Sequence, residues 1–70
     1  MKIGSNCFLV NCDLAKTERR MCKVLAIVEN GRYDYIIAPV DNEKRYISVL
    51  SNSVRSPKAG EVKAGVRLFD

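Results

Sequence analysis

The chain has 70 residues, of which 47% are hydrophobic and 29% charged, and this balance excludes a disordered chain. Its length excludes a protein of several domains, so we expect one small domain over residues 1–70. At this size only about 60% of the unfolded surface is buried on folding, and the formal charge of +4 favours anionic partners without defining a site.

Targeting signals are not evident in the sequence. The first ten residues contain no apolar block of signal-peptide length, because Asn11 and Asp13 follow the short run Cys7–Val10. The longest apolar run, Val24–Val28, is far shorter than the roughly 20 residues that span a bilayer. We therefore expect a cytoplasmic protein that does not bind membranes.

The first predicted strand covers Cys7–Cys12 and is followed by a charged stretch, residues 13–23. Asp13 belongs to the residue types that cap helices, so a short helix can begin there. Leu14 and Met21 are too sparse to form an apolar stripe, which favours a loop or a single helical turn. A full helix would change the fold class from all-β to β-rich α+β.

The strongest local signal is Asn30-Gly31, because both central residues of a type I′ turn need positive φ and this pair adopts it at little cost. It predicts a tight hairpin in which Glu29 faces Arg32. Counting outward, one predicted face carries Val24, Ala26, Val28, Tyr33, Tyr35 and Ile37, side chains that pack well across antiparallel strands. The opposite face carries Leu25, Ile27 and Ile36 among charged residues.

Pro39 cannot donate a ladder hydrogen bond and is predicted to end the second hairpin strand, after which residues 41–44 form a polar turn. The next predicted strand, Arg45–Leu50, is rich in strand-forming side chains, and Ser51-Asn52-Ser53 breaks it. Residues 54–59 are interpreted as a connection or one turn of 3₁₀ helix.

The last predicted strand begins at Glu61. Val62, Ala64, Val66 and Leu68 alternate with Glu61, Lys63, Gly65 and Arg67, a pattern typical of a half-buried strand with a basic outer face. This strand brings the predicted number to five. Five short strands with tight later turns favour a small antiparallel barrel of the SH3, Sm or OB kind, whose closure removes exposed strand edges.

Residues for catalysis are scarce. The chain has no histidine, and its 8 carboxylates mostly flank turns, so we expect no enzyme. Cys22 lies between Arg20 and Lys23 and is the thiol best placed for a lowered pKa, but strand alternation also puts it beside Val24, which favours a buried structural role. No glycine-rich phosphate-binding motif occurs, so no nucleotide cofactor is expected.

The three cysteines are Cys7, Cys12 and Cys22, an odd number that favours a reducing compartment over a disulfide framework. We interpret them as small buried hydrophobic side chains. A zinc site would need a fourth ligand, for which Asp13 is the only nearby candidate, and the spacing contains no C-x₂-C pair. We therefore expect no metal.

Two kinds of partner remain open, a protein or a nucleic acid. Nucleic acid would use cations around an exposed aromatic ring, for which the candidates are Arg32, Lys44, Arg45, Lys63 and Arg67 with Tyr46. The opposite face of the hairpin carries three aliphatic side chains that one small core does not need. They are Leu25, Ile27 and Ile36, and they indicate a second contact layer. That layer is the domain's own barrel, a homodimer interface or a foreign partner.

We favour a non-catalytic protein that acts stoichiometrically, as a small protein-binding adapter or inhibitor of the kind by which phages modulate host machinery. The alternative is a basic small-barrel module that binds nucleic acid or a ribonucleoprotein. The absence of any nucleic-acid-binding motif favours the first function, whereas the basic charge favours the second.

Overall fold

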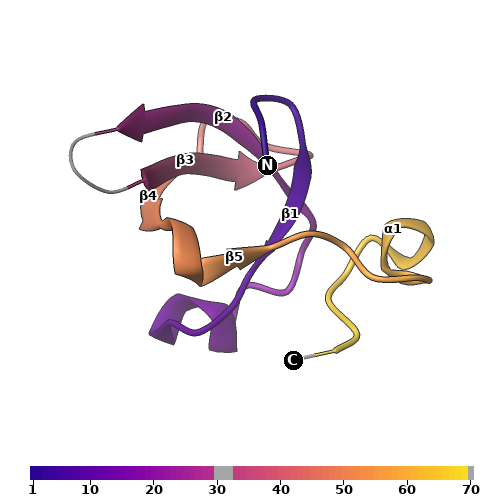
Figure 1. Cartoon of the computed structure of the whole chain (residues 1–70). Coiled ribbons are helices and arrows are strands. Elements are labelled where there is room, and N and C mark those ends of the chain that lie inside the picture. Colours follow the sequence, from indigo (N-terminus) through magenta and orange to yellow (C-terminus); the bar gives the residue numbers. More distant parts are fainter. Residues whose placement is uncertain (30–32, 70) are drawn as a thin grey trace.

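The computed structural model describes residues 1–29 and 33–69, and within them the chain forms five short strands and three single helical turns. The strands are β1 (Asn6–Leu9), β2 (Cys22–Glu29), β3 (Tyr33–Pro39), β4 (Ile47–Leu50) and β5 (Val54–Arg55). They make one antiparallel sheet in the order β4-β3-β2-β1-β5 (Figure 1). The helical turns are η1 (Asp13–Lys16), η2 (Ser51–Ser53) and α1 (Glu61–Ala64). The expected small β-rich domain is therefore confirmed.

The sheet curls so that its two edge strands approach each other. β4 and β5 lie at opposite ends of the strand order, yet only the three residues of η2 join them. In a flat sheet, four spacings of about 4.8 Å would separate these edges by about 19 Å. The chain from Leu50 to Val54 reaches about 14 Å even when fully extended, so the sheet has to bend back on itself. Among the described residues no ladder joins β4 to β5, and the curled sheet stays open.

The hairpin of β2 and β3 differs in register from the prediction near its turn. Glu29 pairs with Tyr33 and not with Arg32. The predicted Asn30-Gly31 turn and Arg32 itself lie outside the described residues. Pro39 ends β3 as predicted, since its ring nitrogen has no hydrogen to donate to a further ladder bond.

A β-bulge at Leu25 explains why only part of the predicted register is right. On one side of the bulge Val24 pairs with Ile37, as predicted, and on the other side Ala26 pairs with Ile36. An extra residue in one strand shifts every later side chain of that strand to the other face. The predicted faces of β2 are therefore right before the bulge and inverted after it.

The core lies inside the curl of the sheet. It consists of Cys7, Leu9, Ala15, Cys22, Val24, Ile37 and Val54, with Cys12, Ile27, Tyr35, Ile47 and Val49 packed against it. Ile27, predicted on the outer face, thus packs against the core. Ile36 lies in register with Ala26 and Ser48 on the opposite face of the sheet, and Leu25 occupies the bulge. The predicted second contact layer of three aliphatic residues does not form one surface.

The predicted last strand, residues 61–68, is wrong. Glu61 begins the one-turn helix α1, which ends at Gly65 with a φ of 73°. After it Val66 forms an isolated β-bridge with Arg20 and belongs to none of the named strands. The fifth strand of the sheet is β5, which falls in the segment interpreted as a connection. By contrast, the stretch after the first strand, predicted as a loop or a single helical turn, contains one 3₁₀ turn, η1.

In the C-terminal segment, residues 56–69, several residues of the predicted alternation are buried or exposed contrary to the prediction. Glu61 and Arg67, expected on the solvent side, are buried. Val62 and Leu68, expected on the core side, are 57% and 51% exposed. The segment is held in place by the hydrogen bonds of Glu61 and Arg67 and by the ion pair of Glu61, which are described below. Burial of apolar side chains contributes less.

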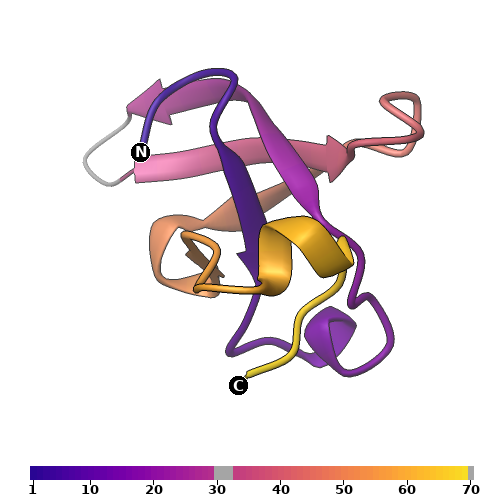
Figure 2. The same cartoon turned by 90° about the vertical axis from the view of Figure 1, so that its right-hand side faces the viewer.

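The C-terminal segment lies against the outer face of β1. Figure 2 shows α1 beside the end of β1. Phe8 points to the outer face, because its neighbours in β1 belong to the core cluster, and it is fully buried. The guanidinium carbon of Arg55 lies 5.6 Å from the centroid of the Phe8 ring. A second, smaller buried layer therefore backs the sheet.

Candidate functional site

Two adjoining cavities open where η1 and the residues after it face the turn between β3 and β4. The first has a volume of about 240 Å³ and is lined by Leu9, Leu14, Glu18, Cys22, Ile37, Pro39, Arg45, Tyr46 and Ile47. The second has a volume of about 450 Å³ and is lined by Leu14, Thr17, Glu18, Arg19, Arg20 and Arg45. Because they share Leu14, Glu18 and Arg45, we treat them as one groove with an apolar and a charged compartment.

The floor of the apolar compartment is one end of the core. Leu9, Cys22 and Ile37 come from β1, β2 and β3, and each is at most 1% exposed. The rim differs from the floor, because Leu14 on η1 and Tyr46 before β4 are 45% and 65% exposed. An apolar hollow between two exposed apolar side chains is suited to enclose one bulky side chain of a partner.

The acidic residue of the groove, Glu18, is neutralised within the chain. The Arg20 guanidinium donates from Nε to Oε1 of Glu18 at 3.0 Å and from Nη2 to Oε2 at 2.9 Å. The backbone N–H of Arg20 also donates to Oε1. These hydrogen bonds, with the nearby charge of Arg45, hold the pKa of the Glu18 carboxyl below its usual value. Glu18 therefore stays ionised, with both of its oxygens engaged.

The other acidic side chains near the groove are also paired. Asp41 lies 3.4 Å from Nη1 of Arg20, and Glu43 forms an ion pair with Lys23. Three cations remain at the groove or next to it in sequence, namely Arg19, Lys44 and Arg45. In the described part of the chain none of these three forms an ion pair. The charged compartment consequently carries an excess of positive charge.

The sequence-predicted site residues are only partly brought together. Arg45 and Tyr46 line the groove, and the exposed Lys44 precedes them in the same turn. Lys63 is exposed on α1 and does not line the groove. The predicted outer-face position of Arg67 is wrong, because its side chain is buried between β1 and η1.

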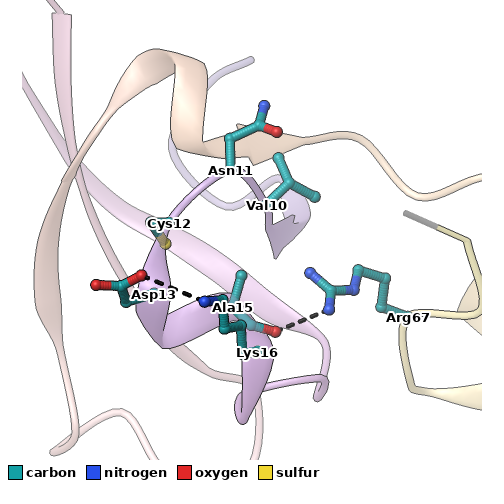
Figure 3. Close-up of a pocket in the computed structure, with 7 residues that line it drawn as sticks. All are labelled: Val10, Asn11, Cys12, Asp13, Ala15, Lys16 and Arg67. Atoms are coloured by element: carbon teal, nitrogen blue, oxygen red, sulfur yellow. Dashed lines mark hydrogen bonds and ion pairs between the residues drawn. The ribbon is translucent and has the colours of Figure 1, made fainter.

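Arg67 borders a different cavity, of about 410 Å³, which lies beside η1 (Figure 3). Its guanidinium donates to the carbonyl of Leu9 at 2.6 Å and to that of Ala15 at 2.7 Å. Ala15 belongs to η1, the turn that also carries Leu14. Arg67 therefore ties η1 to the end of β1, and in doing so it positions one rim of the groove.

Leu14 and Arg19 are groove residues that the sequence analysis did not select. Leu14 was considered only as part of an apolar stripe, which it does not form. A single exposed apolar residue is normal on a protein surface, so the sequence held no specific signal for Leu14. Arg19 carried no such signal either, since its place in the charged compartment depends on the fold of the whole stretch.

The structure offers little support for chemistry at the cysteines. Burial raises the pKa of the Cys22 thiol to about 11 and that of Cys7 to about 12, with the neighbouring Cys22 adding to the second shift. A thiol with so high a pKa is a poor nucleophile at neutral pH. Within residues 1–29 and 33–69, no group of three or more Cys, Asp or Glu side chains is arranged to hold a metal ion.

Comparisons of the chain with protein-family models, with curated proteins and with solved structures found no match. The described part of the chain contains no helix of the length and apolar character needed to cross a membrane. Functional inference therefore rests on the groove.

Proposed function

We propose that the chain is a non-catalytic binding domain that acts stoichiometrically, by taking a segment of a protein partner into the groove. The observation that carries this proposal is the apolar compartment, in which buried core residues form the floor and the exposed Leu14 and Tyr46 form the rim. Concave apolar sites with a few charged groups at their edge are typical of peptide recognition. An adapter or an inhibitor needs only such a surface.

We further propose that the curled sheet is an opened small barrel of the SH3, Sm or OB kind. Two features support it: β1 pairs with both β2 and β5, and the short turn η2 brings the two edge strands close together. In this arrangement the groove is the open end of the barrel. The long connection between β1 and β2 then forms one of its walls.

Nucleic acid is the second candidate partner, and Tyr46 is the observation that favours it. Tyr46 is 65% exposed and follows Lys44 and Arg45 directly, a combination suited to stacking a base beside a phosphate. Burial of Arg67, however, removes one of the cations expected on a continuous basic surface. We therefore rank the protein partner first.

A selection from a phage-displayed library of random peptides tests the protein-binding proposal. An enriched peptide is synthesised, and its affinity for the chain is measured by isothermal titration calorimetry. We expect Leu14→Ser to weaken binding by about tenfold or more, because the rim of the apolar compartment is lost. Val62→Ser is the matched control, since Val62 is also an exposed aliphatic side chain but lies on α1.

Either of two results would overturn the proposal: no enriched peptide, or an enriched peptide whose affinity Leu14→Ser leaves unchanged. A random single-stranded DNA oligonucleotide provides the other arm of the experiment. Salt-sensitive binding of this oligonucleotide, lost in Tyr46→Ala, supports the nucleic-acid alternative instead.

A further inference from the structure

We infer that the segment taken up by the groove is acidic, with one bulky apolar side chain flanked by carboxylates. The apolar side chain enters the apolar compartment, and the carboxylates bind Arg19 and Arg45 in the charged compartment. This inference rests on the proposed function and adds the chemistry of the partner to it.

The first step concerns the charge that is left over at the groove. Glu18, the acidic residue that lines both compartments, has its two oxygens bound by Arg20. Arg20 also reaches Asp41, so its charge is offset. Arg19 and Arg45 line the charged compartment without an ion-pair partner in the described part of the chain. A partner that supplies carboxylates completes this arrangement.

The second step concerns the type of cation. Both unpaired side chains in the charged compartment are arginines, and the planar guanidinium binds a carboxylate through two parallel hydrogen bonds. The Nη2 atom of Arg19 already donates to the carbonyl of Arg67 at 2.8 Å, which restricts the position of its head group. Arg45 is exposed, so its guanidinium is accessible to a ligand.

The third step concerns spacing. The two compartments share Leu14, Glu18 and Arg45, so they are directly adjacent. In an extended segment, consecutive residues are about 3.3 Å apart and alternate residues point to the same side. An acidic side chain one or two positions from the apolar residue therefore reaches the charged compartment. A basic segment would place like charges against Arg19, Lys44 and Arg45, which is unfavourable.

Four short synthetic peptides of equal length test this inference. The first has one leucine between pairs of aspartates, the second has asparagines in place of the aspartates, the third has lysines there, and the fourth keeps the aspartates but has glycine for the leucine. Binding is followed by chemical-shift changes in ¹⁵N-labelled protein at about 20 mM and about 150 mM salt. A single-stranded oligothymidylate serves as the nucleic-acid probe.

We expect the acidic leucine peptide to bind at least about tenfold more tightly than each of the other three, and to shift resonances of groove residues. Its affinity should fall as salt rises. Arg45→Gln should weaken its binding by about fivefold and reduce the salt dependence. Lys2→Gln is the control, because it removes the same charge from an exposed residue that does not line the groove.

The possible failures are distinguishable. If the asparagine peptide binds the groove as tightly as the acidic one, the acidic partner is excluded while the groove keeps its function. If the acidic peptide does not bind, this inference falls, and the phage selection decides separately about the proposed function. If the oligothymidylate binds more tightly than every peptide and Arg45→Gln weakens it, the groove is a nucleic-acid site.

Discussion

The carboxylate of Glu61 organises the C-terminal segment. It accepts two hydrogen bonds of 2.7 Å from the Arg55 guanidinium and three from the backbone amides of Lys58, Leu68 and Phe69. These bonds, those from Arg55 first, hold the pKa of Glu61 far below its ordinary value of 4.5, although burial acts in the opposite direction. Ionised Glu61 is therefore a structural requirement.

A pH dependence of stability follows from this lowered pKa. A depressed pKa in the folded state means that the contribution of Glu61 is fully present above about pH 4.5 and is lost as the pH falls toward the folded value. We expect the melting temperature to drop on acidification below about pH 4.5. Glu61→Gln should melt lower at neutral pH and show a flatter decline, because it has no carboxylate to protonate.

Circular dichroism melts between about pH 7 and about pH 3 provide the measurement. Asp13→Asn is the control, because Asp13 is fully exposed and its pair with Lys16 at 3.7 Å is also exposed. Equal losses of stability on acidification in Glu61→Gln and in the unmodified chain would show that another group governs the pH dependence.

At the scale of elements, strands and strand ends were predicted correctly where residues close in the sequence determine them. The strand-forming side chains of β2 and β3 and the ring of Pro39 identified two strands and one strand end. The bulge at Leu25 was not predictable, because it depends on the bend of the sheet and leaves no mark in the alternation of side chains. Its omission inverted the predicted faces beyond Val24.

The C-terminal segment shows a different limit of sequence analysis. The alternation from Glu61 to Leu68 matched a half-buried strand and indicated that its apolar face would be buried, which is the wrong face. Long-range bonds to Arg55 and to the Leu9 carbonyl decided this in favour of the charged residues. Arg45 and Tyr46 are exposed, as predicted. Arg67 is not, because its burial depends on hydrogen bonds to residues that are distant in the sequence.

Gly65 is the element-scale position with the most specific backbone requirement. Its φ of 73° ends α1, its N–H donates to the Glu61 carbonyl at 2.7 Å, and its own carbonyl accepts from Met21. We expect Gly65→Ala to lower the free energy of unfolding by about 1 kcal/mol, because an L side chain resists positive φ. A Cβ at this position would meet no atom within 4 Å, so the cost is backbone strain and not a clash.

Urea unfolding, with an unchanged dependence on denaturant concentration, measures this effect. Lys63→Ala is the control, since it changes an exposed residue of the same helix. An increase in stability in Gly65→Ala would contradict the assignment, because alanine stabilises such a site only where φ is negative.

At the scale of the whole molecule, the C-terminal segment is part of the fold and not an appendage. Arg67 joins this segment to Leu9 and Ala15, and Glu61 joins it to Arg55 in the edge strand β5. These contacts support the outer face of β1 and the position of η1. The groove consequently depends on residues that do not line it, because Arg67 bonds to Ala15 of η1 and accepts a hydrogen bond from Arg19.

A chain that ends at Pro57 tests this dependence. It loses the two charge-assisted hydrogen bonds of Arg67, worth about 3 kcal/mol together. It also uncovers the outer side of β1, where exposure of Phe8 costs about 2 kcal/mol more. A 70-residue domain has a total stability of about 4–10 kcal/mol, so we expect the shortened chain to be largely unfolded at 25 °C or to melt far below the full chain.

Circular dichroism and the dispersion of amide proton resonances report on folding of the shortened chain. The full chain carrying Val62→Ser and Lys63→Ser is the matched control, because both replaced side chains belong to the same segment and are exposed. This variant should melt close to the unmodified chain, since surface substitutions away from specific contacts change stability little. A shortened chain that melts cooperatively at the temperature of the full chain would show that β1 to β5 fold without the segment, and that Arg67 does not position η1.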